Sequence, residues 1–383
     1  MRRISGNRRK RAALVTVFCL ASALHAVEFA GGTGRPYDPY QIATAEQLIS
    51  IGSDPNLLDK HFVLLNDIDL DPNLPGGAVF VRAVIGADTD DNFGFQGAAF
   101  TGYFDGNDHR IKNLTIQCAL GYYVGLFGCI GDDGFVQDLV LENILITGAH
   151  YVVGGLAGIN RGDIRSCRVD GSLHVGTRPY IESLGGMVGV NTGKILWSCA
   201  ETNTHGDGKS RSLGGLVGTN WEGRIVGCHA EGSLTGGDSL GGLVGNNVEG
   251  IILDCYVEGS VLTEVSSPGS GGLVGYNQAG VIVNCYAATI LRKGIDRWDW
   301  GGLVGYGAPR VLAGGIVGSA VANSFWDTEA SGASVSHGGT GLSTLQMYQQ
   351  KTFVGWDFDY TWSICEGKDY PRLRWEAIDC NGL

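Results

Sequence analysis

A short glycine-rich segment recurs along most of this chain at nearly constant spacing. It reads GLFG at 125–128, GGLAG at 154–158 and GGMVG at 185–189, then GGLVG at 214–218, 241–245, 271–275 and 301–305, and a degenerate GGIVG at 314–318. The first seven copies lie 27 to 31 residues apart. A period that holds so closely indicates one structural turn per copy, stacked on its neighbours. The repeats therefore predict one elongated domain, although 383 residues would otherwise suggest two or three globular ones.

Each unit shares further positions after the glycine segment. An Asn-x-Gly or Asn-x-x-Gly sequence indicates a turn, because Asn and Gly tolerate positive φ. An isoleucine and a cysteine follow, and a spacing of three requires a bend between them if both face inward. Beyond the cysteine, apolar residues alternate with period two, and helical spacing is missing. This pattern predicts an all-β fold: a right-handed parallel β-solenoid with coils of about thirty residues.

The cysteines of the repeats are expected to face inward as a ladder of small, buried, unoxidised side chains. One cysteine per coil provides no C-x-x-C pair and no Cys/His set for a metal. The ladder comprises Cys167, Cys199, Cys228, Cys255 and Cys285. Cys365 and Cys380 lie outside it, either as a disulfide or as two free thiols, and Cys118 and Cys129 are weaker candidates for pairing.

The first 26 residues have the features of a signal peptide. Six basic side chains between Arg2 and Arg11 precede a short apolar run, and Ala21–Ala23 forms an A-x-A cleavage site, with an uncleaved anchor as the alternative. Cleavage would leave 21 basic and 39 acidic side chains, a formal charge of −18. So acidic a surface repels nucleic acid and anionic membranes. We expect an exported, secreted or cell-surface protein, monomeric and without membrane insertion after cleavage.

The GGLVG segment and its period resemble the GLUG repeat of secreted and surface bacterial proteins. The flanks resemble them too: GGTGRPYDPYQIATAEQL at 31–48, FVLLNDIDLD at 62–71 and NSFWDT at 323–328. The resemblance implies a solenoid found in adhesin-like proteins and beside IgA-cleaving metallopeptidases. Those peptidases carry H-E-x-x-H in a separate domain, whereas none of the eight histidines here precedes a glutamate. Peptidase activity is therefore not implied.

The predicted organisation is a signal peptide at 1–26, an N-terminal cap with the first coils at 27–122, the repeat solenoid at 123–322 and a C-terminal cap at 323–383. A capping box at Thr44 predicts a helix at 44–52 that covers the N-terminal end. A second short helix is expected from Ser343 to Lys351, at the other end. Three tryptophans are expected to pack beneath it: Trp356, Trp362 and Trp375.

Two surface features are candidates for ligand binding. Trp298, Asp299 and Trp300 precede a repeat where other units have small or polar residues, and two indoles beside a carboxylate could hold a sugar ring. An outward stripe beside the cysteines contains Arg168, His229, Tyr256 and Tyr286, flanked by acidic residues. Each feature also has a purely structural interpretation. The tryptophan segment could pack against the C-terminal flank, and the stripe could be the side-chain stacking that any repeat produces.

No catalytic constellation is visible and no cofactor is expected, with calcium as the alternative. The acidic loop of Asp88, Asp90 and Asp91 is the calcium candidate. We therefore expect a binding or adhesion module for glycans, polysaccharide, extracellular matrix or a surface protein. The alternatives are a purely structural surface scaffold and a β-helix polysaccharide lyase or hydrolase.

Overall fold

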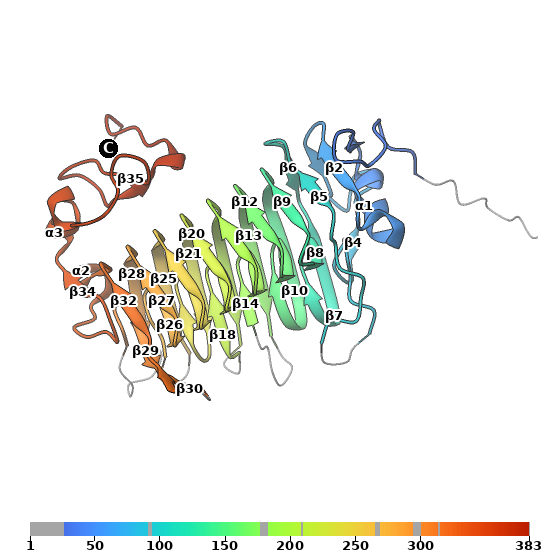
Figure 1. Cartoon of the computed structure of the whole chain (residues 1–383). Coiled ribbons are helices and arrows are strands. Elements are labelled where there is room, and N and C mark those ends of the chain that lie inside the picture. The colour runs from blue at the N-terminus through green and yellow to red at the C-terminus, as the bar shows by residue number, and fades with distance from the viewer. Residues whose placement is uncertain are drawn as a thin grey trace, which may run out of the picture.

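The computed structural model describes residues 27–382, except for 91–93, 177–182, 208–209, 265–268, 294–299 and 313–314. The chain forms a parallel β-solenoid whose coils stack in sequence order from one end of the molecule to the other (Figure 1). The pairings between the described strands of successive coils are parallel, and the predicted solenoid with thirty-residue coils is confirmed.

Three sheets form the sides of the coils. The first has ten strands, in spatial order β1 (Tyr40–Ile42), β2 (His61–Leu64), β5 (Tyr103–Asp105), β9 (Phe135–Gln137), β12 (Asp163–Arg165), β16 (Lys194–Leu196), β20 (Arg224–Val226), β24 (Ile251–Leu253), β27 (Val281–Val283) and β32 (Ala320–Ala322). The third has seven: β29 (Val304–Ala308), β26 (Val274–Gln278), β23 (Val244–Val248), β19 (Val217–Trp221), β15 (Val188–Asn191), β11 (Ala157–Asn160) and β8 (Phe127–Ile130).

The second sheet has fifteen strands. Its main path runs β22 (Leu240–Gly241), β18 (Ser212–Gly214), β14 (Ser183–Gly185), β10 (Val140–Gly154), β13 (Arg168–Val175), β17 (Cys199–Gly206), β21 (His229–Gly236), β25 (Tyr256–Thr263), β28 (Tyr286–Lys293), β33 (Phe325–Asp327) and β34 (Thr340–Leu342). At the N-terminal end it adds β3 (Ile68–Asp69), β4 (Val79–Phe80), β6 (Arg110–Lys112) and β7 (Thr115–Val124). Two small antiparallel pairs lie outside these sheets: β30 (Arg310–Leu312) with β31 (Gly315–Val317), and β35 (Trp362–Ser363) with β36 (Arg372–Leu373).

A single residue with positive φ turns each coil from the first sheet into the second. These corner residues have φ between 45° and 61° and stack in register: Asp138, Ser166, Trp197, Gly227, Asp254, Asn284 and Asn323. The turn brings the residue that follows each corner back to the interior. The bend expected between the isoleucine and the cysteine of each repeat is thus confirmed: both side chains are buried in all five predicted pairs, and both face inward in four of them.

The repeat asparagines do not serve as positive-φ turn residues. Their side chains are fully buried and form an inward ladder, in which the Nδ2 of each of the first four donates to the Oδ1 of the next at 2.8–2.9 Å: Asn160, Asn191, Asn220, Asn247 and Asn277. The following glycine is required for space, since a Cβ at Gly250 would lie 2.1 Å from Asn220 Nδ2. Asn ladders of this kind hold identical coils in register.

The predicted inward position is wrong for one cysteine of the ladder, Cys199. Cys199 pairs in register with Arg168 and His229 on the outer face of the second sheet, and Ser198 takes the inward position. The Ser198 hydroxyl accepts from the Cys167 N–H at 3.0 Å and donates to Leu196 O at 2.8 Å. The other four cysteines face inward and are buried as free thiols, as expected: Cys167, Cys228, Cys255 and Cys285.

Short helices lie in the two flanks of the solenoid. The predicted N-terminal helix is confirmed as α1 (Ala45–Ser53), which begins with a complete capping box between Thr44 and Gln47. It is followed by η1 (Pro55–Leu57). The C-terminal flank contains α2 (Thr328–Ser331), α3 (Thr344–Met347), η2 (Gln350–Thr352) and η3 (Arg374–Glu376). None of the helices in the described ranges is long and apolar enough to cross a membrane.

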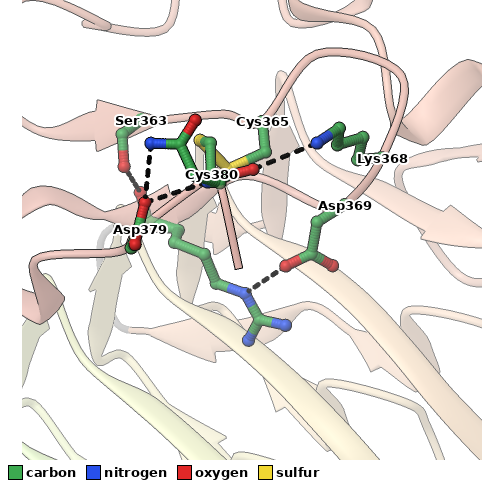
Figure 2. The surroundings of a disulfide bond; sticks show 8 residues. Ser363, Cys365, Lys368, Asp369, Asp379 and Cys380 are labelled. Carbon is green, nitrogen blue, oxygen red and sulfur yellow. Dashed lines mark hydrogen bonds and ion pairs between the residues drawn. A yellow bond between two sulfur atoms is a disulfide. The ribbon is translucent and has the colours of Figure 1, made fainter. Parts of the chain in front are cut away.

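A disulfide closes the C-terminal flank. Cys365 and Cys380 are bonded, and their Cα atoms lie 5.4 Å apart, so the first of the two predicted states holds (Figure 2). The Lys368 ammonium donates to Cys380 O at 3.1 Å within the same loop. Cys129 is a buried free thiol, while the side chain of Cys118 lies outside the described set.

Candidate functional site

An open groove of about 570 Å³ follows the corner between the first and second sheets. The corners of four coils form its floor and one wall, and the C-terminal segment around η3 contributes the rest. Its lining is Asp108, Asp138, Ser166, Cys167, Arg168, Trp197, Cys199, Glu201, His229, Glu231, Trp375 and Glu376. Ligand sites in proteins are concave and of this general size.

Trp197 is the most unusual backbone position in the groove. It is the corner residue of its coil, with φ of 50°, and such a conformation is rare for a bulky side chain. The neighbouring corner is Gly227, where a Cβ would lie 2.7 Å from Trp197 Cδ1. The missing side chain therefore makes room for the indole, which is 46% exposed.

Trp375 faces the same corner from the C-terminal segment. Its Nε1–H donates to Gly227 O at 3.0 Å, and 41% of the residue stays exposed. The indole was expected to pack beneath the C-terminal helix with Trp356 and Trp362. Those two are buried there, but Trp375 instead stacks on His229 at 5.3 Å between ring centroids. The groove therefore presents two partly exposed indoles from distant parts of the chain.

Acidic side chains and one arginine complete the polar lining. Arg168 forms an exposed ion pair with Glu201 at 2.7 Å, and Glu231 lies beside Glu201 in the next coil. Burial raises the pKa of the Glu201 carboxyl, and burial followed by the nearby Asp105 raises that of Asp138. Charged oxygens of this kind accept hydrogen bonds from hydroxyl groups.

His229 is held rigidly at the inner end of the groove. Its imidazole lies between the rings of Tyr256 and Trp375, stacked on both, and only 4% of the residue is exposed. Burial lowers the pKa of His229 to about 3, with a further lowering from Arg372, so the ring is neutral. The Nδ1 atom has no hydrogen-bond partner and lies 3.8 Å from Glu376 Oε1.

Cys199 and Glu201 lie next to this ring. The ligand atoms of Cys199, Glu201 and His229 all lie within 4.8 Å of one another. Cys199 is almost fully buried, and burial raises the pKa of its thiol.

The expected aromatic stripe is not an open surface. Tyr256 and Tyr286 do point away from the solenoid core, but both are fully buried because the C-terminal segment folds over this face of the second sheet. The Tyr286 hydroxyl donates to Pro371 O at 2.9 Å, and the Tyr256 hydroxyl donates to Glu376 Oε2 at 2.8 Å. Neither tyrosine is accessible to a ligand in this structure.

Arg372 fastens the C-terminal segment to the same face. Its guanidinium donates to Glu258 at 3.0 Å and to the Tyr256 hydroxyl at 3.1 Å, and it also contacts Asp369. Burial raises the pKa of Glu258 to about 7, against the opposing effect of Arg372. The segment that was expected to cover the end of the solenoid therefore also covers its side.

The structure gives little support to the other two predicted sites, the tryptophan segment and the acidic loop. Trp298, Asp299 and Asp91 lie outside the described residues, and Trp300 is half-buried, so the tryptophan segment stays a prediction. Asp88 Oδ1 accepts from the N–H groups of Thr89 and Gln96 and holds its own loop. Among the described residues, neither Asp88 nor Asp90 belongs to a cluster of three possible metal ligands.

Sequence reasoning did not single out Trp197, Trp375, Cys199 or Glu201 as site residues. One signal was available, because Ile195 and Cys199 are four residues apart whereas the other pairs are three apart. A one-residue shift moves a side chain to the opposite face of a strand. The approach of Trp375 had no comparable signal, since it depends on how the C-terminal segment folds back.

Comparisons with known proteins agree with this architecture. The sequence is 37% identical over 147 residues to a provisionally named Gly-rich membrane protein of Evansella cellulosilytica, covering 37% of this chain and 16% of that one. It is 31% identical over 179 residues to Halomucin of Haloquadratum walsbyi, covering 45% and 2% respectively. The matched regions thus span less than a fifth of either relative.

A solved structure has the same fold. The crystal structure of a provisionally named immunoglobulin A1 protease from Bacteroides ovatus superposes with a TM-score of 0.55 at 20% identity, over 91% of this chain and 95% of the other. At that identity the likeness concerns the fold alone. The family model of the GLUG motif matches residues 210–235, which belong to one coil of the repeated series. The chain therefore contains a GLUG motif, within a series of repeats that share its glycine-rich segment.

Proposed function

We propose that this chain is a cell-surface binding module whose corner groove holds a segment of carbohydrate. The observation that carries the proposal is the pair of partly exposed indoles, Trp197 and Trp375, on the walls of one groove. Aromatic side chains combine a large apolar face with a polar edge. The apolar faces of sugar rings can stack on such surfaces.

The polar groups between the indoles fit the same ligand class. Glu201, Glu231 and Asp138 provide acceptors for sugar hydroxyls, and Arg168 provides donors. Arg168 and Glu201 pair with each other on an exposed surface, so the pair can exchange partners at small cost. The groove volume, about 570 Å³, suits a short oligosaccharide segment rather than a large protein surface.

The relatives support a location at the cell surface. One is named a membrane protein and the other Halomucin, and both share long stretches of sequence with this chain. A rigid rod of stacked coils is well suited to present a lateral groove away from a surface. We further propose that the groove serves adhesion, with an extracellular glycan as its ligand.

The experiment is a panel of polysaccharides and glycans probed with the purified chain, followed by calorimetric titration of the best binder. Trp197→Ala should weaken binding at least tenfold. Trp221→Ala is the matched control, because Trp221 is also 46% exposed but does not line the groove. Circular dichroism establishes that both variants are folded.

Two outcomes would overturn the proposal. One is saturable binding that Trp197→Ala leaves unchanged, which would direct attention to Trp298 and Trp300. The other is no binding to any member of the panel, which favours a structural scaffold. Release of shortened or unsaturated sugars would instead indicate a hydrolase or lyase activity.

A further inference from the structure

We propose that Cys199, Glu201 and His229 form a binding site for a divalent transition metal of the zinc class. The repeat explains why they meet. Cys199 and His229 are register partners on adjacent strands β17 and β21, and Glu201 lies two residues beyond Cys199 on the same outer face. Cys199 stands one position later than the cysteines of the other repeats, in the outward slot of Arg168 and His229, so its thiol faces the groove.

The separation of the three ligand atoms is close to what a metal needs. In a tetrahedral zinc site with bonds of about 2.0–2.3 Å, neighbouring ligand atoms lie roughly 3.3–3.8 Å apart. The corresponding atoms here all lie within 4.8 Å of one another. The Glu201 side chain is 29% exposed, so its carboxylate has room to adjust toward the metal.

His229 supplies the independent observation. Only 4% of the residue is exposed, and its Nδ1 makes no hydrogen bond, with Glu376 Oε1 lying 3.8 Å away. A buried polar atom left without a partner is rare in proteins and calls for an explanation. The ring is also fixed by stacking on Tyr256 and Trp375, so it is preorganised as a neutral imidazole ligand.

The donor set selects the class of metal. A thiolate, an imidazole and a carboxylate suit Zn²⁺ and its first-row neighbours, whereas Ca²⁺ takes six to eight oxygen ligands. Binding would release the Cys199 thiol proton to solvent and form the metal–sulfur bond. Arg168 holds Glu201 Oε2, which leaves the other carboxylate oxygen for the metal. The groove side of the site stays open to water or a ligand.

The test uses the purified, tag-free chain stripped of metal and titrated with Co²⁺ and with Zn²⁺ alone. We expect one site per chain, a thiolate-to-cobalt charge-transfer band, and displacement of that band by Zn²⁺. Cys199→Ser should abolish the band, and Glu201→Gln and His229→Gln should each weaken binding at least tenfold. Cys255→Ser is the matched control, because this thiol is equally buried but faces inward.

The proposal fails if no stoichiometric binding occurs, or if a folded Cys199→Ser chain keeps the cobalt–thiolate band. Should His229→Gln not fold, the surface-facing Cys199→Ser and Glu201→Gln variants still decide the question. Trp197→Ala is expected to bind metal normally. Metal binding and carbohydrate binding can therefore fail or succeed separately.

Discussion

The buried asparagine ladder gives a sharp test of what holds the coils in register. Asn220 lies in its middle, where Nδ2 donates to Gly223 O at 3.1 Å and to Asn247 Oδ1 at 2.8 Å. Asn220→Asp changes almost no volume but removes both donations at neutral pH. Two lost hydrogen bonds and two unsatisfied buried acceptors together cost about 3–5 kcal/mol of unfolding free energy.

The end of the ladder provides the control. Asn277 donates to Gly280 O at 3.1 Å, but its register partner in the next coil is Gly307, so it has no asparagine to donate to. Its Oδ1 can still accept from Asn247 after substitution. Asn277→Asp should therefore cost about 1–2 kcal/mol, clearly less than Asn220→Asp.

The cost at position 220 should also depend on pH. An aspartate beside a buried carbonyl oxygen is stabilised in its protonated form, so its pKa in the folded state rises above the unfolded value of about 3.9. Stability is then greatest below about pH 4 and is lost as the pH rises through the folded-state pKa. Urea unfolding at about pH 7 and about pH 4, each referenced to the unsubstituted chain, measures both effects. Equal costs in the two variants, or a cost at position 220 that ignores pH, would refute the reasoning.

Two further predictions concern the other inward ladder and the C-terminal segment. In urea unfolding, Cys255→Ser should lower the free energy of unfolding by less than about 1 kcal/mol, and by less than Cys255→Ala does. Ser198 already shows that a hydroxyl in this column finds a hydrogen-bond donor and an acceptor. A larger loss of stability for Ser than for Ala would contradict this reasoning. Arg372→Met should cost about 3–5 kcal/mol and expose the C-terminal segment to proteolysis, because it leaves Glu258 buried without its cation. Arg374→Met, on an exposed side chain, is the control and should change proteolysis little.

The repeat period and its alternation were enough to predict the solenoid. Each coil can bury its apolar side chains only against its neighbours, so a thirty-residue period leaves few architectures open. The asparagines were misinterpreted because two physical roles share one residue type. A turn residue and an amide ladder both favour Asn before Gly, and only the stacked geometry distinguishes them.

The site was harder to predict because it depends on contacts between distant segments. His229, Tyr256 and Tyr286 share one outward column, as their alternation indicated. Whether that column is open is decided by residues of the C-terminal segment, far along the sequence, which fold back onto it through Arg372 and Trp375. No local periodicity carries that information.

Departures from the repeat locate the groove. Identical coils stack identical side chains, and a column of equal residues runs parallel to the rod without converging on any point. Convergence needs the symmetry to be broken. Here the cysteine stands one position later than in the other repeats, so Cys199 faces outward; the next corner, Gly227, lacks a side chain, and Trp197 enters the space that it leaves. Because these three breaks occur in adjacent coils, where η3 of the C-terminal segment also lies, exchanging the two residues (Ser198→Cys together with Cys199→Ser) should remove the thiol from the groove while keeping the solenoid.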